Sequence, residues 1–127
     1  MRAIKTDEQA ILEATVRSAL PIDRAETNPT QEERQQILDS LANTQVVREC
    51  ECGTCPSITL ALDTPTTGYS GVLSAETVDD SALVLVHIRQ GAVKELEIAP
   101  LHEGVSVALP APAALVLGEL PSPQSVV

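Results

Sequence analysis

The hydrophobic period of this chain changes near residue 44, and that change constrains the fold more than any other feature. Before it, apolar residues recur every three or four positions, as on one face of a helix. After it, apolar residues alternate or form short runs between turn-forming residues, as in strands. Helices followed by a run of strands are typical of the α+β class. We therefore predict helices packed against one antiparallel sheet.

Two N-terminal segments have the period and the end signals of helices. The first covers residues 6 to 20, with Thr6 as the expected N-cap and Pro21 as the stop. The second covers residues 29 to 42 and is capped by Asn28. The short linker between them predicts an antiparallel helical hairpin.

Six strand-like segments follow, separated by Gly, Pro and Asp residues. They span residues 45–50, 57–62, 70–78, 82–89, 92–98 and 104–109. Short turns between closely spaced strands indicate an antiparallel meander of five or six strands. A single domain is therefore expected over residues 1–109, with the helical hairpin at 6–42 and the sheet at 45–109. Residues 110–127 form a Pro-rich C-terminal tail, of which the apolar stretch 114–117 is able to dock on the domain.

The clearest hairpin joins ALVLVHIR to AVKELEI through Gln90-Gly91. A two-residue turn there pairs Arg89 with Ala92, and each earlier pair follows by count. Counting places the core under two pairs, Leu83 with Ile98 and Leu85 with Leu96. The same count puts His87 at the edge of that face opposite Lys94, and it puts Val84, Val86, Ile88, Val93, Glu95 and Glu97 on the other face.

Composition restricts both the core and the function. The chain has 127 residues with no Phe, no Trp and one Tyr, so its core must be built from Val, Leu, Ile and Ala. Its formal net charge of −10 and its lack of aromatic platforms disfavour nucleic-acid binding. The acidic residues are scattered, as on a solvated surface.

The segment near the N-terminus is charged and does not resemble a signal peptide. The longest apolar run, residues 82 to 86, is far too short to span a bilayer, so no membrane partner is expected. Three cysteines, an odd number, together with no export signal predict a cytoplasmic location.

Cys50, Cys52 and Cys55 form a C-x-C-x-x-C cluster in a chain reversal at Gly53 and Thr54. The bend brings three sulfurs close together, but zinc prefers four ligands, and the fourth would have to be His87 or His102. A redox centre at Cys52 and Cys55 lacks the following helix that lowers a thiol pKa. We expect reduced thiols that pack as small apolar groups and no resident cofactor, with zinc binding and thiol redox chemistry as alternatives.

The other candidate residues have plain structural interpretations. Neither His87 nor His102 has a nucleophile at a recognisable spacing, and Glu95 and Glu97 are typical of a solvated strand face. Tyr69, the one aromatic residue, is the candidate interaction residue because Tyr is enriched at interface hot spots.

Two stretches resemble a group of small uncharacterised actinobacterial proteins. They are CECGTCPSITL, at residues 50 to 60, and VLVHIRQGAVKELEI, at residues 84 to 98. The resemblance implies a helical N-terminus, a Cys-Gly-Cys-Pro-Ser-like turn and a sheet with a Glu-Leu-Glu strand. This chain departs from the group by inserting Thr54 before Cys55. The resemblance implies no activity.

No catalytic motif is present, so we expect a small acidic non-catalytic binding or regulatory protein whose partner is another protein. A metal or thiol-redox protein using the cysteine cluster is one alternative, and a virion or assembly component is another.

Overall fold

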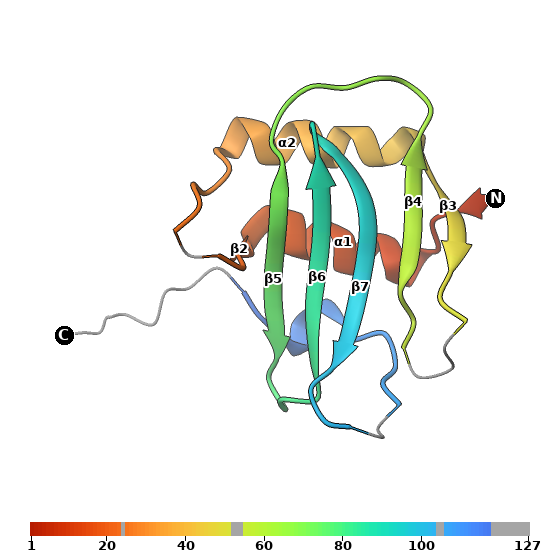
Figure 1. Ribbon diagram of the computed structural model, residues 1–127, viewed down its shortest axis with the longest axis vertical. Coiled ribbons are helices and arrows are strands. Elements are labelled where there is room, and N and C mark those ends of the chain that lie inside the picture. Colours follow the sequence, from red (N-terminus) through yellow and green to blue (C-terminus); the bar gives the residue numbers. More distant parts are fainter. Residues whose placement is uncertain (24, 52–54, 104–105, 118–127) are drawn as a thin grey trace.

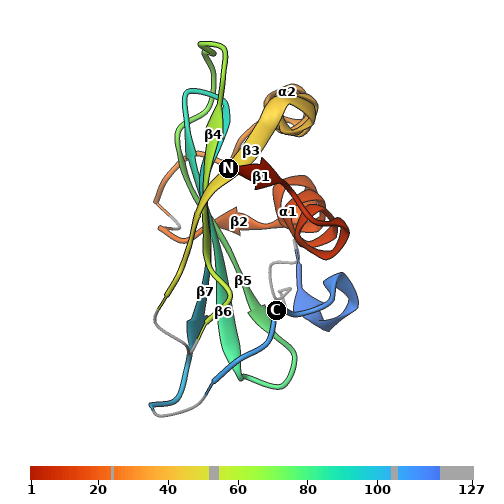
Figure 2. The same cartoon turned by 90° about the vertical axis from the view of Figure 1, so that its right-hand side faces the viewer.

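The computed structural model describes residues 1–23, 25–51, 55–103 and 106–117, and these form two layers. One layer is an antiparallel sheet, and the other contains the helices α1 (Thr6–Ser18) and α2 (Gln31–Ser40). Both helices run across the strands on the same side of the sheet (Figures 1 and 2). The α+β class predicted from the change of period is confirmed.

The sheet has eight strands within the described residues. They are β1 (Arg2–Ala3), β2 (Leu20–Pro21), β3 (Thr44–Glu49), β4 (Ile58–Leu62), β5 (Gly71–Thr77), β6 (Ala82–Arg89), β7 (Ala92–Pro100) and β8 (Leu115–Val116). Their order is β1-β3-β4-β7-β6-β5-β2, with β8 also pairing with β5. The predicted strand count was too low because three of these strands are only two residues long, which leaves no period to detect. Residues 106–109, predicted as part of a strand, form none.

The predicted meander is also wrong. After β4 the chain crosses over the end of the sheet and enters β5 on the far side, as the green connection in Figure 1 shows. The hairpins β5-β6 and β6-β7 then return the chain, so that β7 pairs with β4. This order is that of a Greek key. It places β6 and β7 at the centre of the sheet.

The two helices are not joined directly as a hairpin. After α1 the chain forms β2, which pairs with β5 at the sheet edge, before it reaches α2. The caps also differ from those predicted. Lys5 precedes α1, and its backbone N–H donates to the Glu8 carboxylate at 2.9 Å. Thr30 caps α2 in place of Asn28, in a capping box with Glu33.

Arg34 joins the two helices. Its guanidinium donates to the carbonyl oxygens of Val16 and Ala19, each at 2.9 Å, at the C-terminal end of α1. These carbonyls have no partner within their own helix, so the cation satisfies them and complements the negative end of the helix dipole. The Arg34 side chain is buried, and this burial lowers its pKa.

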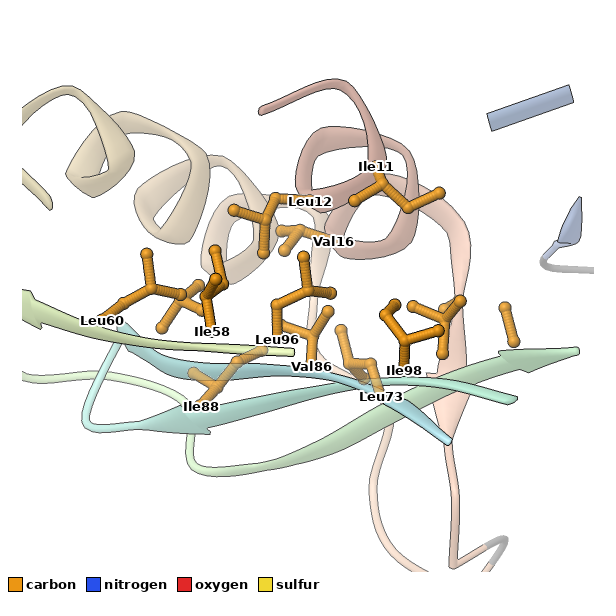
Figure 3. Close-up of a cluster of buried hydrophobic side chains, with 14 of the residues drawn as sticks. Ile11, Leu12, Val16, Ile58, Leu60, Leu73, Val86, Ile88, Leu96 and Ile98 are labelled. Atoms are coloured by element: carbon orange, nitrogen blue, oxygen red, sulfur yellow. The ribbon is translucent and has the colours of Figure 1, made fainter. Parts of the chain in front are cut away.

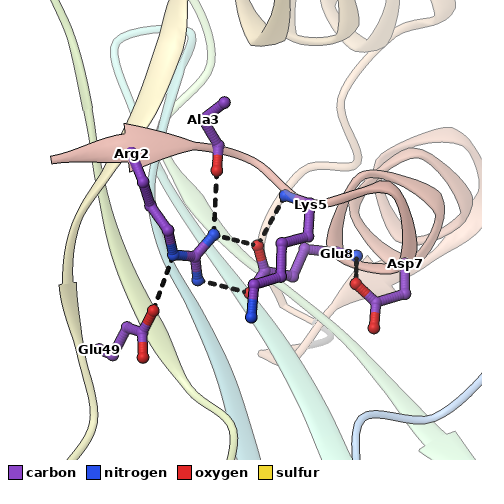
Figure 4. Close-up of polar contacts among 6 residues, drawn as sticks. All are labelled: Arg2, Ala3, Lys5, Asp7, Glu8 and Glu49. Carbon is purple, nitrogen blue, oxygen red and sulfur yellow. Dashed lines mark hydrogen bonds and ion pairs between the residues drawn. The ribbon is translucent and has the colours of Figure 1, made fainter.

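Arg2 anchors the N-terminus in a similar way. It donates to both oxygens of Glu8 on α1 at 2.9 Å and to Glu49 on β3 at 2.7 Å (Figure 4). The helix and the edge of the sheet are therefore linked through one guanidinium, in charge-assisted hydrogen bonds.

The core lies between the helices and the sheet and is aliphatic, as the composition predicts (Figure 3). Its fully buried side chains include Ile11, Leu12, Val16, Ile37, Leu73, Val84, Val86, Val93, Leu96 and Ile98. The C-terminal segment closes the layer beside α1. There the short 3₁₀ helix η2 (Pro112–Ala114) and β8 dock on the domain, as the apolar stretch 114–117 suggests.

The β6-β7 hairpin confirms the predicted turn but corrects the core face. Arg89 pairs with Ala92 and Ile88 with Val93, as counted. The register then shifts at a β-bulge, after which His87 pairs with Glu95 and Val86 with Leu96. Leu96 and Ile98 are buried as predicted, but they lie with Val84, Val86 and Ile88. Leu83 and Leu85, predicted in the core, are half-buried and face away from the helices.

Candidate functional site

The sheet face opposite the helices is the candidate functional site. Both helices, η2 and β8 lie on one side of the sheet (Figure 2). On the other side, the described residues place only the connection from β2 to α2, near the edge beside β5, so most of this face is uncovered. The alternation along β6 points Leu83, Leu85 and His87 to this side. They are half-buried rather than exposed, because neighbouring strands shield them.

Strand pairing gives the neighbours of these three residues. Leu85 lies between Ser74 on β5 and Glu97 on β7, and His87 lies between Val72 and Glu95. Beyond β5, Leu20 pairs with Ser74, and the exposed Ile22 donates its backbone N–H to Val72 at 2.9 Å. The uncovered face therefore has an apolar part and an acidic part. We call Leu20, Ile22, Val72, Leu83 and Leu85 the apolar strip.

The acidic part carries a cluster of possible metal ligands. His87, Glu95 and Glu97 each offer one ligand atom, and these atoms all lie within 4.8 Å of one another. His87 Nε2 and Glu97 Oε1 are 3.0 Å apart, and the side chains are 34% and 38% exposed. The cluster can act as a hydrogen-bonded ion pair or as a partial coordination sphere.

The bulge creates this cluster. Without it His87 would face Lys94, and both glutamates would lie on the opposite side of the sheet. Counting from the turn therefore missed the cluster. One signal for it exists in the sequence: Val93 and Leu96 are both large and apolar but three positions apart, so they can share a buried face only if an extra residue stands between them.

The cysteine turn lies at the end of the β3-β4 hairpin. Cys50 donates its backbone N–H to the Ser57 carbonyl at 2.9 Å, and Cys50 Sγ lies 3.5 Å from Cys55 Sγ. Ser57 Oγ is 3.4 Å from Cys55 Sγ and accepts the Ile98 backbone N–H at 2.9 Å. Cys52, the third member of the predicted cluster, lies outside the described residues. Of the three sulfurs expected to lie close together, the structure thus places Cys50 Sγ beside Cys55 Sγ.

The structure does not group the described cysteines with a histidine. Among the described His, Cys, Asp and Glu residues, the one group with metal-ligand proximity consists of His87 and the two glutamates. His102 lies in an exposed loop, where its Nε2 donates to the Asp80 carbonyl at 3.1 Å. Reduced thiols therefore stay the prediction for the cysteines, and zinc stays the alternative.

Tyr69, the predicted interaction residue, is half-buried against the core. Its hydroxyl is buried, and it has no hydrogen-bond partner among the described groups. Burial raises the pKa of Tyr69, Glu26 raises it further, and Arg34 opposes them. The hydroxyl is thus turned into the protein, and the role of Tyr69 in an interface stays a prediction.

A scan against protein-family models finds no match for this chain, and neither does a search of curated proteins or of solved structures. Of the helices that the structure describes, none has the length and apolar character needed to cross a membrane.

Proposed function

We propose that this chain is a non-catalytic binding protein and that it binds a polypeptide partner on the uncovered face of its sheet. The observation that carries the proposal is the apolar strip. A sheet with one face on a core commonly presents polar side chains to water on the other. Here the central strand β6 instead presents Leu83 and Leu85, and β5 adds Val72, which lies opposite His87 and diagonal to Leu85. Contiguous apolar surface bounded by polar residues is typical of interaction sites.

The charges beside the strip favour a basic partner. Glu95 and Glu97 border it on β7, and Glu76 lies opposite Leu83 on β5. The whole chain also carries a net charge of −10. A basic amphipathic segment fits this surface, because its apolar residues can cover the leucines while its Lys or Arg residues approach the carboxylates. The net charge would also speed the encounter with such a partner.

The test uses peptides as the probe. Peptides selected from a random display library against the full chain should be basic and amphipathic. Their affinity should fall at least about tenfold, or 1.4 kcal/mol, in Leu85→Ser. Val47→Ser is the matched control, because Val47 is 41% exposed on β3, which β4 and β7 separate from β6, and it should leave the affinity unchanged.

Two results would contradict the proposal. One is a selection in which no peptide depends on Leu85. The other is a native mass spectrum that shows an oligomer of this chain dissociating in Leu85→Ser, because a second copy would then occupy the face. That second result would favour the alternative that this chain is a virion or assembly component.

A thiol or zinc function of the cysteine turn is the second candidate, favoured by the 3.5 Å between Cys50 Sγ and Cys55 Sγ. Native mass spectrometry of protein purified without added metal would test it. A mass increase matching one zinc ion, or the loss of two hydrogens, that disappears in Cys55→Ser would support it. An unchanged reduced mass would exclude it.

A further inference from the structure

We propose that His87, Glu95 and Glu97 bind a divalent transition-metal ion on the uncovered face of the sheet. The site is separate from the cysteine turn, and the inference goes beyond the proposed function, since it holds whether or not a polypeptide binds beside it.

The spacing of the three side chains suits a small cation. Ligands about 2.0–2.2 Å from a tetrahedral zinc ion lie about 3.4 Å from one another. The His87 Nε2 to Glu97 Oε1 distance of 3.0 Å is already close to this, and all three ligand atoms lie within 4.8 Å of one another. Glutamate has three side-chain torsions, so rotation of Glu95 can close the remaining gap without moving the backbone. The sheet thus holds the three groups near their coordinating positions.

Core packing accounts for the bulge, because it lets Val93 and Leu96 share the buried face, but fold stability gives little reason for two carboxylates to stand beside His87. A half-exposed ion pair adds at most about 1 kcal/mol, and two carboxylates placed together repel each other. Placing both carboxylates beside His87 also requires the bulge at Lys94. Bulges often re-aim side chains at functional sites. A bound cation would relieve the repulsion and use all three groups.

The ligand types select the metal. One imidazole and two carboxylates suit zinc, manganese or cobalt, whereas magnesium and calcium prefer all-oxygen sites. Three protein ligands leave at least one position open. Because the side chains are partly exposed, water or an atom of a docked partner can fill that position.

The experiment must separate this site from the thiols. We therefore use the full untagged chain with Cys50, Cys52 and Cys55 all changed to Ser, treated with a chelator and titrated with Zn²⁺ by calorimetry. One ion per chain should bind, and Mg²⁺ should bind at least about tenfold more weakly. His87→Gln and Glu97→Gln should each weaken Zn²⁺ binding at least about tenfold. Loss of a residue that only hydrogen-bonds to a metal ligand already costs about 10–100-fold in metal affinity, so loss of a ligand should cost at least the lower value.

Two control substitutions make the same His→Gln and Glu→Gln changes at residues outside the cluster. His102→Gln and Glu76→Gln should leave Zn²⁺ affinity unchanged, and far-UV circular dichroism should show that all variants are folded. Bound Co²⁺ gives an independent signal, a visible absorption band that should be lost in His87→Gln. The proposal is overturned if no stoichiometric ion binds, if His87→Gln binds as tightly as its parent, or if Mg²⁺ binds as tightly as Zn²⁺.

Discussion

Replacing Leu96 and Leu85 separately with Ala tests the register of the central hairpin. The two residues are identical in type and lie on adjacent strands, but the bulge puts them on opposite faces of the sheet. Leu96 is fully buried in the core, whereas Leu85 is half-buried on the uncovered face. Without the bulge, the two would pair with each other in the core.

The expected costs differ severalfold. Leu→Ala removes three carbon atoms, which are worth about 2.4 kcal/mol at 0.8 kcal/mol for each buried group. At Leu96 a cavity between sheet and helices adds to this, so we expect a loss of about 3–4 kcal/mol. At Leu85 part of the side chain already meets water and no closed cavity forms, so we expect about 1 kcal/mol.

Urea denaturation followed by far-UV circular dichroism is the suitable assay, because the chain has no Trp and only one Tyr. The free energies of unfolding should be compared at equal denaturant slopes. If Leu85→Ala costs as much as Leu96→Ala, the bulge and the assignment of the uncovered face are wrong. Leu85→Ala should also weaken peptide binding, whereas Leu96→Ala should do so only through loss of folded protein.

Three further substitutions test other contacts by the same assay. Arg34→Ala should cost about 3 kcal/mol, because it removes charge-assisted hydrogen bonds to two carbonyls at the end of α1; a cost below about 1 kcal/mol would refute this linking role. The hydrogen bonds from Arg2 hold the pKa of Glu8 below its ordinary value of 4.5. Glu8 therefore stabilises the fold above that pH, and its contribution is lost as the pH falls through the lower folded-state pKa. Glu8→Gln should lower the free energy of unfolding by about 1–2 kcal/mol at neutral pH. The difference in this free energy between the variant and the wild type should shrink below pH 4.5, and a difference that grows there would contradict the role of Glu8. Gly91→Ala should cost at least about 1 kcal/mol, because Gly91 has φ +81° and a Cβ there would lie 2.5 Å from the Thr67 carbonyl oxygen; unchanged stability would contradict this.

The sequence by itself determined the features that depend on local period and local chemistry. Both long helices, the five long strands and the Gln90-Gly91 turn follow from spacings within about ten residues. The aliphatic core follows from composition, because no aromatic residue other than Tyr69 is present to fill it.

Tertiary structure decided what depends on distant partners. The two-residue strands β1, β2 and β8 exist only because the sheet edges supply hydrogen-bond partners. The Greek key order arises because β4 pairs with β7, which lies about thirty residues later, and no local pattern records that choice. The candidate site depends on such a choice as well. His87 meets Glu95 and Glu97 only because the buried face must hold both Val93 and Leu96, and the bulge that satisfies this packing turns the carboxylates toward the imidazole.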